Sequence, residues 1–381
     1  MLRRTVDRFM PSSRKSSRRN FIQGKTKSLP SGDTATTDSL ADWVTDPQEE
    51  TYLIRIGRRA MACQFQVFLN AGQYAEDSEI AINALDEIDM IEAMLTVYRR
   101  DSEVTILNHR AAAELVNLSD PLAELIELSL DLHEITDGAF DITAGPLADL
   151  WSHARRSGSM PSEESIRSAL ADVGSQYVQV DCETKQLRFL RPGVAINFGG
   201  IGKGFALDAA SNMVRLQGIE NFLFHGGRSS VLACGRRSSK RGEEPWRVGL
   251  VHPLRPADRL AEIRLFDRAL STSGSQSQSF HHQGRRYGHI LDPRTGLPAD
   301  QGILSATVLH PSAAWADALS TACYVMGPQQ AIECCKKHPG MALVLVLPSR
   351  KKAGIEIQTC GITPDDVYLI SDQRVAVNQQ D

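Results

Sequence analysis

A glycine-rich segment with a single lysine is the first part of the sequence that could do chemistry. Residues 195–205 read AINFGGIGKGF. Glycines let backbone N–H groups approach phosphate oxygens, a helix start favours anions, and Lys203 adds a positive charge. The segment matches neither the GxxxxGK[ST] phosphate loop nor the GxGxxG dinucleotide pattern. Phosphate binding and a tight structural turn are therefore the two interpretations.

A second segment, 311–322, carries one acid in apolar surroundings and reads PSAAWADALSTA. We expect its helix to be largely buried, and a buried carboxylate needs a partner or a metal. Asp317 and Thr321 are four residues apart, so their oxygens share one helix face. A carboxylate with a hydroxyl suits magnesium, which prefers oxygen ligands. The alternative is an Asp317 that is hydrogen-bonded to backbone.

The third segment, 287–298, reads YGHILDPRTGLP and contains a tight-turn signature. His289 and Asp292 flank a predicted strand end, where binding groups are common. The alternative is a hairpin turn that Asp292 caps.

The fourth segment, 138–151, reads GAFDITAGPLADLW. Asp141 stands alone between two apolar residues. It could cap a helix, or it could accept hydrogen bonds from the ring or ribose of a ligand.

The elements that must position these segments are predicted from hydrophobic periodicity and from end signals. Helices are expected at 75–97, 121–136, 162–172, 204–217, 312–326 and 328–337. Strands are expected at 62–69, 177–181, 186–190, 194–198, 221–225, 230–234, 246–251, 261–265, 304–309, 342–347 and 355–358, with 271–300 as a long polar segment between strands. Strands and helices without strict alternation favour an α+β fold, with mixed and antiparallel sheets packed against helices in one body.

Composition and charge exclude several classes of protein. The chain has 381 residues, of which 42% are hydrophobic and 23% charged, which is typical of globular proteins. Its net charge is -4; the first 30 residues carry nine cations and one acid, so the remainder carries -12. An acidic body argues against nucleic acid as a partner. No stretch approaches the roughly 18 apolar residues of a membrane span, so no integral membrane segment is expected.

The cysteines and the N-terminus bear on location. The chain has seven cysteines without CxxC spacing, which indicates reduced, mostly buried thiols in a cytoplasmic protein. Residues 1–48 are predicted to be a disordered basic leader, and 49–375 the folded body. Arg18 and Arg19 resemble a twin-arginine export signal, but polar residues follow instead of the required apolar stretch. We therefore expect a cytoplasmic protein, with export as the alternative.

Taken together, these segments resemble the FAD:protein FMN transferases, the ApbE-type flavin transferases. The match runs from about 55 to 330 and keeps the order of eight motifs. These are Met61-Ala62-Cys63, Tyr98 through Asn108, 138–151, NFGGIGKGFALD at 197–208, Gly226-Gly227, Ser273-Gly274, HILDPRTGLPA at 289–299, and ADALSTA at 316–322. The order of the motifs makes the resemblance specific, although each one is weak alone. It implies that 49–375 is a flavin transferase domain.

The resemblance implies a reaction and a set of site residues. Family members move FMN from FAD to a Ser or Thr hydroxyl of a target protein, using magnesium and releasing AMP. The positions implied to line the FAD pocket are Met61, Tyr98, Ala139, Phe140, Asp141, Asn197, Lys203 and Leu291. Those implied to contact the metal are Gly200, Asp317, Ser320 and Thr321. His289 and Asp292 are the candidates for the general base that activates the acceptor hydroxyl.

One departure from the family pattern leaves alternatives open. The family usually has Asp where this chain has Asn197, which keeps hydrogen bonding but loses a charge. A non-catalytic protein that binds FAD or assists flavin assembly is therefore one alternative. The other is an FAD pyrophosphate hydrolase, which would use the same site with water as the acceptor.

Overall fold

The structure describes most of the chain after residue 51 and is a computed structural model. The described residues are 52–74, 76–239, 242–274, 279–349, 354–363, 366–369 and 377–380. They lie within one unit of the chain, Ala41–Asp381. The basic leader expected at 1–48 falls outside the described residues, as does the polar stretch 275–278.

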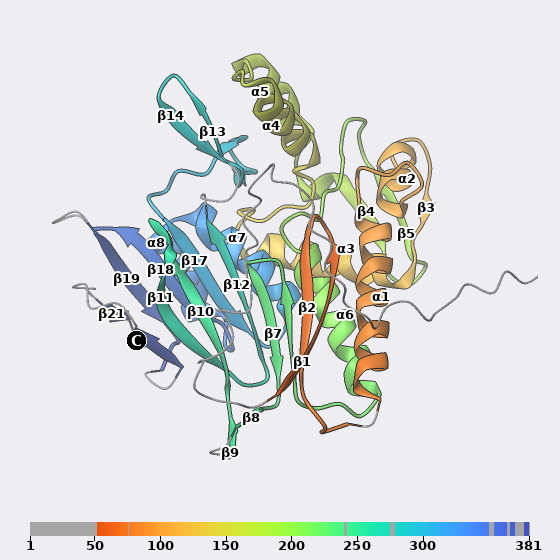
Figure 1. The fold of residues 1–381 in the computed structure, drawn as a ribbon. Helices are drawn as coiled ribbons and strands as arrows, with labels where there is room; N and C mark the ends of the chain where they lie inside the picture. Colours follow the sequence, from red (N-terminus) through yellow and green to blue (C-terminus); the bar gives the residue numbers. More distant parts are fainter. Residues whose placement is uncertain are drawn as a thin grey trace, which may run out of the picture. The chain divides into compact units, whose positions relative to one another are not determined.

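A large sheet forms the centre of this unit, and its described strands follow the order β1-β2-β6-β7-β12-β17-β18-β19-β21 (Figure 1). Neighbours are antiparallel except for β19 and β21, which are parallel. The strands are β1 (Leu53–Ala60), β2 (Cys63–Asn70), β6 (Phe222–Gly226), β7 (Ser230–Cys234), β12 (Arg268–Gly274), β17 (Ser305–His310), β18 (Ala342–Pro348), β19 (Ile355–Cys360) and β21 (Val377–Gln380).

Helices cover one face of the large sheet, and a smaller sheet covers the other (Figure 1). The helices are α1 (Asp77–Leu95), α6 (Gly202–Leu216), α7 (Ala313–Met326) and α8 (Pro328–Lys337). The smaller sheet is formed by β10 (Trp246–His252), β11 (Arg255–Leu265) and β20 (Val367–Leu369). Both faces of the large sheet are therefore buried, which explains the nearly continuous apolar runs of β6, β7 and β18.

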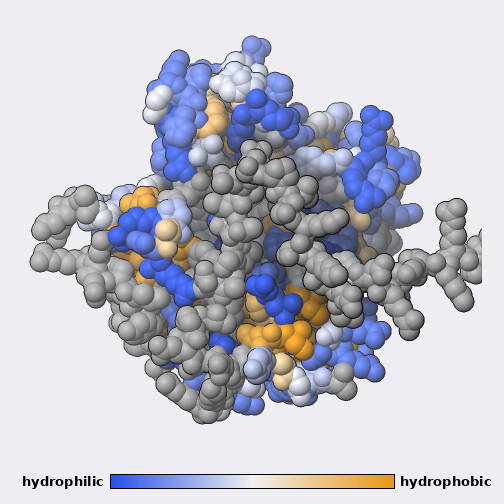
Figure 2. Space-filling view, in the orientation of Figure 1, coloured by the Kyte–Doolittle hydropathy of each residue, from blue (hydrophilic) through white to orange (hydrophobic). Residues whose placement is uncertain are grey.

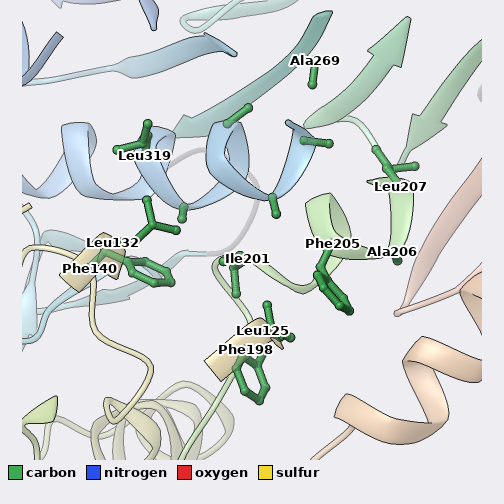
Figure 3. Close-up of a cluster of buried hydrophobic side chains, with 14 of the residues drawn as sticks. Leu125, Leu132, Phe140, Phe198, Ile201, Phe205, Ala206, Leu207, Ala269 and Leu319 are labelled. Atoms are coloured by element: carbon green, nitrogen blue, oxygen red, sulfur yellow. The ribbon is translucent and has the colours of Figure 1, made fainter. Parts of the chain in front are cut away.

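Strand β7 illustrates how alternation supplies both cores. Leu232 and Cys234 belong to the core on the helix side, while Val231 and Ala233 belong to the core beneath the smaller sheet. Successive side chains of a strand point to opposite faces, so one short strand contributes to both layers. Figure 3 shows the helix-side core, where Leu132, Phe140 and Ile201 gather beneath α7.

The remaining described elements include helices and short strands at the edges of these layers. The helices are α2 (Glu103–Arg110), α3 (Asp120–Ile135), α4 (Gly145–Ser157), α5 (Glu163–Ala171) and the short 3-10 helix η2 (Ser175–Tyr177). Strands β3 (Val116–Asn117), β4 (Val178–Asp181) and β5 (Gln186–Phe189) form a three-stranded sheet. Three two-stranded hairpins complete the set: β8 (Arg237–Ser239) with β9 (Gly242–Glu244), β13 (Ser279–His282) with β14 (Arg285–Gly288), and β15 (Leu291–Asp292) with β16 (Leu297–Pro298).

Two expectations from the sequence were wrong. Residues 194–198 form no strand; Ala195 makes only an isolated bridge with Ala144. Instead, the side-chain amide of Asn108 donates to the Ile196 carbonyl at 2.9 Å and accepts from the Ile196 N–H at 2.8 Å. The Asn108 side chain thus forms the hydrogen bonds to the Ile196 backbone that a neighbouring strand would otherwise form. The polar segment 271–300 was expected to lie between strands without strands of its own. It contains the end of β12 and the two hairpins β13–β14 and β15–β16.

The α+β expectation is confirmed, since helices and mainly antiparallel sheets share one body. Five of the seven thiols are buried, Cys63 is half-buried and Cys182 is exposed, as expected of mostly buried free cysteines. Within the described ranges, no helix combines the length and apolar character that crossing a membrane requires.

Candidate active site

The first turns of α6 and α7 meet at the centre of the site. Asp208 of α6 accepts hydrogen bonds from Ser312 Oγ (2.7 Å), the Ala313 N–H (2.8 Å) and the Ala314 N–H (2.9 Å). These would otherwise be unsatisfied donors at the start of α7. Burial raises the pKa of Asp208, and the three donors oppose that rise. One carboxylate of α6 therefore caps α7 and fixes the two helices together.

Gly204 brings the two helices into direct backbone contact. A Cβ at this position would lie 2.1 Å from the Ala313 carbonyl oxygen, so only glycine fits. This approach places the Gly204 N–H 3.1 Å from Oδ2 of Asp317, and Lys203 Nζ lies 3.4 Å from the same oxygen.

The Asp317 carboxylate is only 4% exposed and is held from both sides. Its other oxygen, Oδ1, accepts from Ser271 Oγ of β12 at 2.9 Å and from Ser230 Oγ of β7 at 3.2 Å. A buried carboxylate with four donors satisfies the requirement that buried charge be paired and hydrogen-bonded. Its orientation is consequently determined by two helices and two strands.

Hydroxyl groups collect beside this carboxylate. Ser320 Oγ and Thr321 Oγ1 each donate to the Asp317 carbonyl, at 2.9 and 3.2 Å. Ser273 Oγ, at the end of β12, lies 2.9 Å from Ser320 Oγ and 3.2 Å from Thr321 Oγ1. Gly200 adjoins the same group, because a Cβ there would lie 3.6 Å from Thr321 Oγ1.

This group of residues supplies oxygen donors almost exclusively. Among the described residues, no three His, Cys, Asp or Glu side chains cluster as a metal site. One carboxylate, several hydroxyls and a nearby backbone carbonyl would not suit zinc, which prefers nitrogen and sulfur. They fit a small hard cation such as magnesium, which binds one or two carboxylates and keeps several waters.

The turn before β2 leads into Cys63, which lies near Lys203. Met61 and Ala62 have φ values of 47° and 57°, and they form the two-residue turn between β1 and β2. Burial raises the pKa of the Cys63 thiol, whereas the charge of Lys203 lowers it. The charge of Lys203 thus acts on Cys63 as well as on Asp317.

The loop after α3 carries the predicted residues Ala139, Phe140 and Asp141. Ala139 and Phe140 are 1% and 4% exposed, and the Phe140 ring lies in the core beneath α7 (Figure 3). A Cβ at Gly200 would lie 3.3 Å from that ring. The aromatic side chain thus supports the glycine loop from below.

Asp141 is engaged within the protein through both oxygens. Oδ1 accepts from the Thr143 N–H (2.7 Å), Thr143 Oγ1 (2.6 Å) and Ser175 Oγ (3.1 Å), and Oδ2 lies 3.2 Å from His133 Nδ1. Burial acts to raise the pKa of Asp141, but the contacts with His133 and Thr143 outweigh it and hold that pKa below its usual value. The neighbouring carboxylate in turn raises the pKa of His133. These contacts occupy Asp141 in the turn before α4; it is not a helix cap, because the N-cap of α4 is Ala144.

The segment 289–298 forms the expected turn around Asp292. Asp292 accepts from the Arg294 N–H and Nε, both at 2.9 Å, and from Arg294 Nη2 at 3.0 Å. His289 is half-buried between β14 and β15, and Leu291 is half-buried in β15. Trp151 of α4 donates from Nε1 to the Gly296 carbonyl at 2.8 Å, which fastens the turn to α4.

A cavity of about 280 Å³ lies beside the segment 193–197, lined also by Val97, Asn108 and Asp149. Asn197 reaches it, and its Oδ1 accepts from the Gly199 N–H at 2.8 Å. Tyr98, next to Val97, is 86% exposed. A large exposed aromatic ring near a cavity is available for stacking on a planar ligand.

The structure therefore brings all four predicted segments together. Gly200 adjoins Phe140 and Thr321, while a Cβ at Gly138 would lie 3.8 Å from Arg294. Sequence analysis missed Asp208, Ser230 and Ser271, all of which organise Asp317 or its helix. The only signal for Ser230 was its place at the start of an apolar strand, and Ser271 lay in a segment expected to be polar.

Comparisons with known proteins agree on one family. The sequence model of the ApbE family matches residues 61–345. The FAD:protein FMN transferase of Haemophilus influenzae is 27% identical over 309 residues, covering 79% of this chain and 88% of that protein. The FAD:protein FMN transferase of Chlamydia pneumoniae is 32% identical over 256 residues, covering 66% and 77%.

Solved structures give the same result. The ApbE protein of Thermotoga maritima superposes with a TM-score of 0.71 at 31% identity, covering 80% of this chain and 96% of that one. The flavinyl transferase ApbE of Pseudomonas stutzeri, in its apo form, gives a TM-score of 0.70 at 26% identity, covering 83% and 96%.

Proposed function

The chain belongs to the ApbE family and is an FAD:protein FMN transferase, and we propose that it transfers FMN to a Ser or Thr hydroxyl of a target protein with magnesium bound. In this reaction the acceptor oxygen forms a bond to the FMN phosphorus. The pyrophosphate P–O bond breaks, AMP leaves with the bridging oxygen, and the hydroxyl proton passes to a base. Its partners are accordingly FAD and a flavin-accepting protein.

The observation that carries this proposal is the surrounding of Asp317. A buried carboxylate lies within hydrogen-bond distance of a glycine-loop N–H and 3.4 Å from an ammonium group, and it adjoins a group of hydroxyls. The Lys203 side chain is 23% exposed and Thr321 is half-buried, so both can also contact a pyrophosphate substrate and its cation.

The residues that would hold magnesium are Asp317, Thr321, Ser320 and the Gly200 carbonyl. Bound there, the metal would neutralise negative charge that develops at the transferred phosphorus and on the departing AMP. The network that holds Asp317 from Ser230 and Ser271 fixes the carboxylate before any ligand arrives. Such preorganisation is what makes charged groups effective in phosphoryl transfer.

Lys203 is proposed to contact a phosphate oxygen. Its side chain is 23% exposed, so Nζ can serve the buried Asp317 and a ligand at the same time. The proposed FAD contacts comprise this lysine together with Met61, Tyr98, Ala139, Phe140, Asp141, Asn197 and Leu291. For Ala139 and Phe140, whose side chains are buried in the core, we propose contact through the loop backbone.

His289 is the preferred candidate for the general base. Both oxygens of Asp292, the other candidate, accept hydrogen bonds from Arg294, so its carboxylate is occupied within the turn. We propose that Asp292 shapes the turn that presents His289 and Leu291. The cytoplasmic location stays a prediction from the sequence.

The test is incubation of the protein with FAD, magnesium chloride and a flavin-accepting protein, followed by mass spectrometry of the acceptor. We expect the acceptor to gain the mass of one FMN at a Ser or Thr, with AMP in equal amount. Asp317→Asn keeps the volume of the side chain but removes its charge, and it should abolish the gain. Release of FMN and AMP at the same rate without acceptor would instead identify a hydrolase.

A further inference from the structure

The hairpin formed by β13 and β14, residues 279–288, carries only basic ionisable side chains apart from Tyr287. His281, Arg285 and Arg286 are exposed, and no acidic residue occurs between Ser279 and Leu291. The body of the chain, in contrast, carries a net charge of -12 after residue 30. The end of the unit formed by this hairpin with α4 and α5 is mostly hydrophilic on the face shown in Figure 2.

The ladder of the hairpin places each arginine opposite a histidine. His281 lies opposite Arg286, and His282 lies opposite Arg285. Opposite charges across a ladder stabilise a hairpin. No carboxylate faces either arginine in this ladder, so the two positive charges are not balanced within the hairpin.

Aromatic rings hold one face of the hairpin against the body. Phe280 and Tyr287 are cross-strand partners whose ring centroids lie 5.4 Å apart, and both pack on Trp151 at 6.2 and 6.3 Å. Side chains of a strand alternate between faces, so His281 and Arg286 lie on the opposite face from these rings. Arg286 Nε donates to Ser279 Oγ at 2.9 Å on that outer face.

Both ends of the hairpin lead to the candidate active site. Upstream, Ser273 contacts the hydroxyls of Ser320 and Thr321, and only a few residues separate it from β13. Downstream, β14 leads directly to His289 and Leu291. Four residues at roughly 3.4 Å each give an arm of about 14 Å. A polypeptide whose hydroxyl enters the active site can therefore also contact the arginines of the hairpin.

From this placement we propose that the exposed basic side chains of the hairpin, with His281 and Arg286 on its outer face and Arg285 at its edge over the Tyr287 ring, dock an acidic segment of the flavin-accepting protein that flanks the accepting hydroxyl. The inference deepens the proposed function and rests on it. Arg285 lies 2.9 Å from Asp300 in an exposed pair, which is 63% and 74% exposed at its two side chains. An exposed pair of this kind contributes little and can exchange for a partner carboxylate.

The acidic body favours a protein partner over a nucleic acid. A polyphosphate chain longer than the hairpin would meet the negative charge of the rest of the unit. A short acidic segment can contact the hairpin alone. Complementary charge of this kind sets which partner binds and how fast it associates.

Binding can be tested without the transfer reaction. A fluorescently labelled peptide with one Thr flanked by Asp residues is titrated with the full chain, and anisotropy gives its affinity. We expect it to bind about tenfold tighter than the same peptide with Asn in place of Asp. The double variant Arg285→Glu, Arg286→Glu should remove this preference. Equal binding of both peptides, or tighter binding of a labelled single-stranded DNA of equal length, overturns the inference.

The transfer assay then separates docking from chemistry. With an acceptor that the wild-type chain modifies, the double variant should raise the acceptor KM about tenfold and leave FAD affinity and kcat unchanged. Arg264→Glu is the matched control for each single substitution, since it makes the same Arg→Glu charge change at an exposed position of β11 on the other side of the large sheet. Loss of FAD affinity in the double variant would assign the hairpin to FAD and contradict docking.

Failure of the two proposals would look different. A wild-type chain that modifies no acceptor contradicts the proposed function, whereas the peptide titration still decides on the hairpin. A wild-type chain that modifies its acceptor, with a double variant of unchanged KM, contradicts the docking inference alone. Far-ultraviolet circular dichroism and the thermal midpoint of the variant show whether the hairpin substitution has disturbed the fold.

Discussion

The backbone N–H of Gly204 and the carboxylate of Asp317 lie 3.1 Å apart, across the contact between α6 and α7. The contact exists because no side chain separates the two helices at this point. Gly204 thus has two roles, since it permits the close approach of the helices and it donates to the central carboxylate. Separating the helices would also withdraw one of the four donors that hold Asp317.

Gly204→Ala should be strongly destabilising. Its Cβ would fall 2.1 Å from the Ala313 carbonyl oxygen, which is backbone and cannot move aside cheaply. We expect the free energy of unfolding to fall by about 3 kcal/mol, measured by urea denaturation. The matched control is Gly202→Ala in the same turn, where the nearest atom is a flexible Leu95 methyl at 3.3 Å. A loss of similar size in both variants would show that the helix contact is not the cause.

Thr321→Val should weaken the affinity of the enzyme for magnesium. The substitution preserves shape but removes the hydroxyl that lies beside Gly200 and Ser273. We expect the magnesium concentration for half-maximal transfer to rise about tenfold, measured in titrations after removal of metal with EDTA. Thr321→Ser restores the hydroxyl and should return most of the affinity. An unchanged magnesium titration in the valine variant would remove Thr321 from the metal site.

His133 should make stability depend on pH near neutrality. Its contact with Asp141 raises its folded-state pKa above the unfolded value of about 6.5. The contribution is complete below pH of about 6.5 and is lost as pH rises through the folded-state pKa. Asp141 itself has a lowered pKa, so its own contribution is present above pH of about 3.9 and is lost only in acid.

His133→Gln should therefore flatten the change in unfolding free energy between pH 6 and 8 by about 1 kcal/mol or less. Denaturation at a series of pH values measures the difference. His153→Gln, at an exposed position of α4, is the control and should leave the profile as in the wild type. A wild-type profile that is already flat in this range would contradict the assigned role of the pair.

Asn197→Asp should increase the transfer rate several-fold. The Oδ1 atom of Asn197 is an acceptor for the Gly199 N–H, and an aspartate would keep that bond while adding charge at the cavity. Asn108→Asp is an informative contrast, because Asn108 must donate as well as accept and the variant should lose stability. If Asn197→Asp leaves kcat and the FAD KM unchanged, the missing charge is irrelevant to the reaction.

Regular elements were predictable where one physical signal was sufficient. Strand β7 and helix α8 occur at the predicted residues, because a short apolar run and a proline-initiated amphipathic pattern leave few alternatives. The segment 194–198 was mistaken for a strand because its apolar residues alternate. Periodicity reports which side chains are buried, but it cannot report that Asn108 rather than a strand satisfies the backbone.

The residues proposed to contact the ligand were easier to predict from the sequence than the residues that hold them in position. Asp317, Thr321 and Lys203 could be named from the types of residue and their spacing. Ser230 and Ser271 could not, because their role arises only when β7 and β12 become neighbours and place both hydroxyls at one carboxylate. The same holds for Asp208, whose function as the cap of α7 depends on a contact between residues about a hundred positions apart in the chain.

The clamp of Asn108 on Ile196 has a consequence for the ligand. The segment before the glycine loop is held by the Asn108 side chain of α2. It is also held by the Ile142 carbonyl, which accepts from the Asn197 N–H at 2.8 Å. Because of these contacts the segment is already ordered in the free protein. Binding then requires little loss of backbone entropy, which is the usual obstacle to tight binding by loops. FAD affinity should therefore depend on Asn108, whose side chain lines the cavity and holds Ile196 in place. Weaker hydrogen bonds from Asn108 would slow the association of FAD even if the contacts between protein and nucleotide stayed the same.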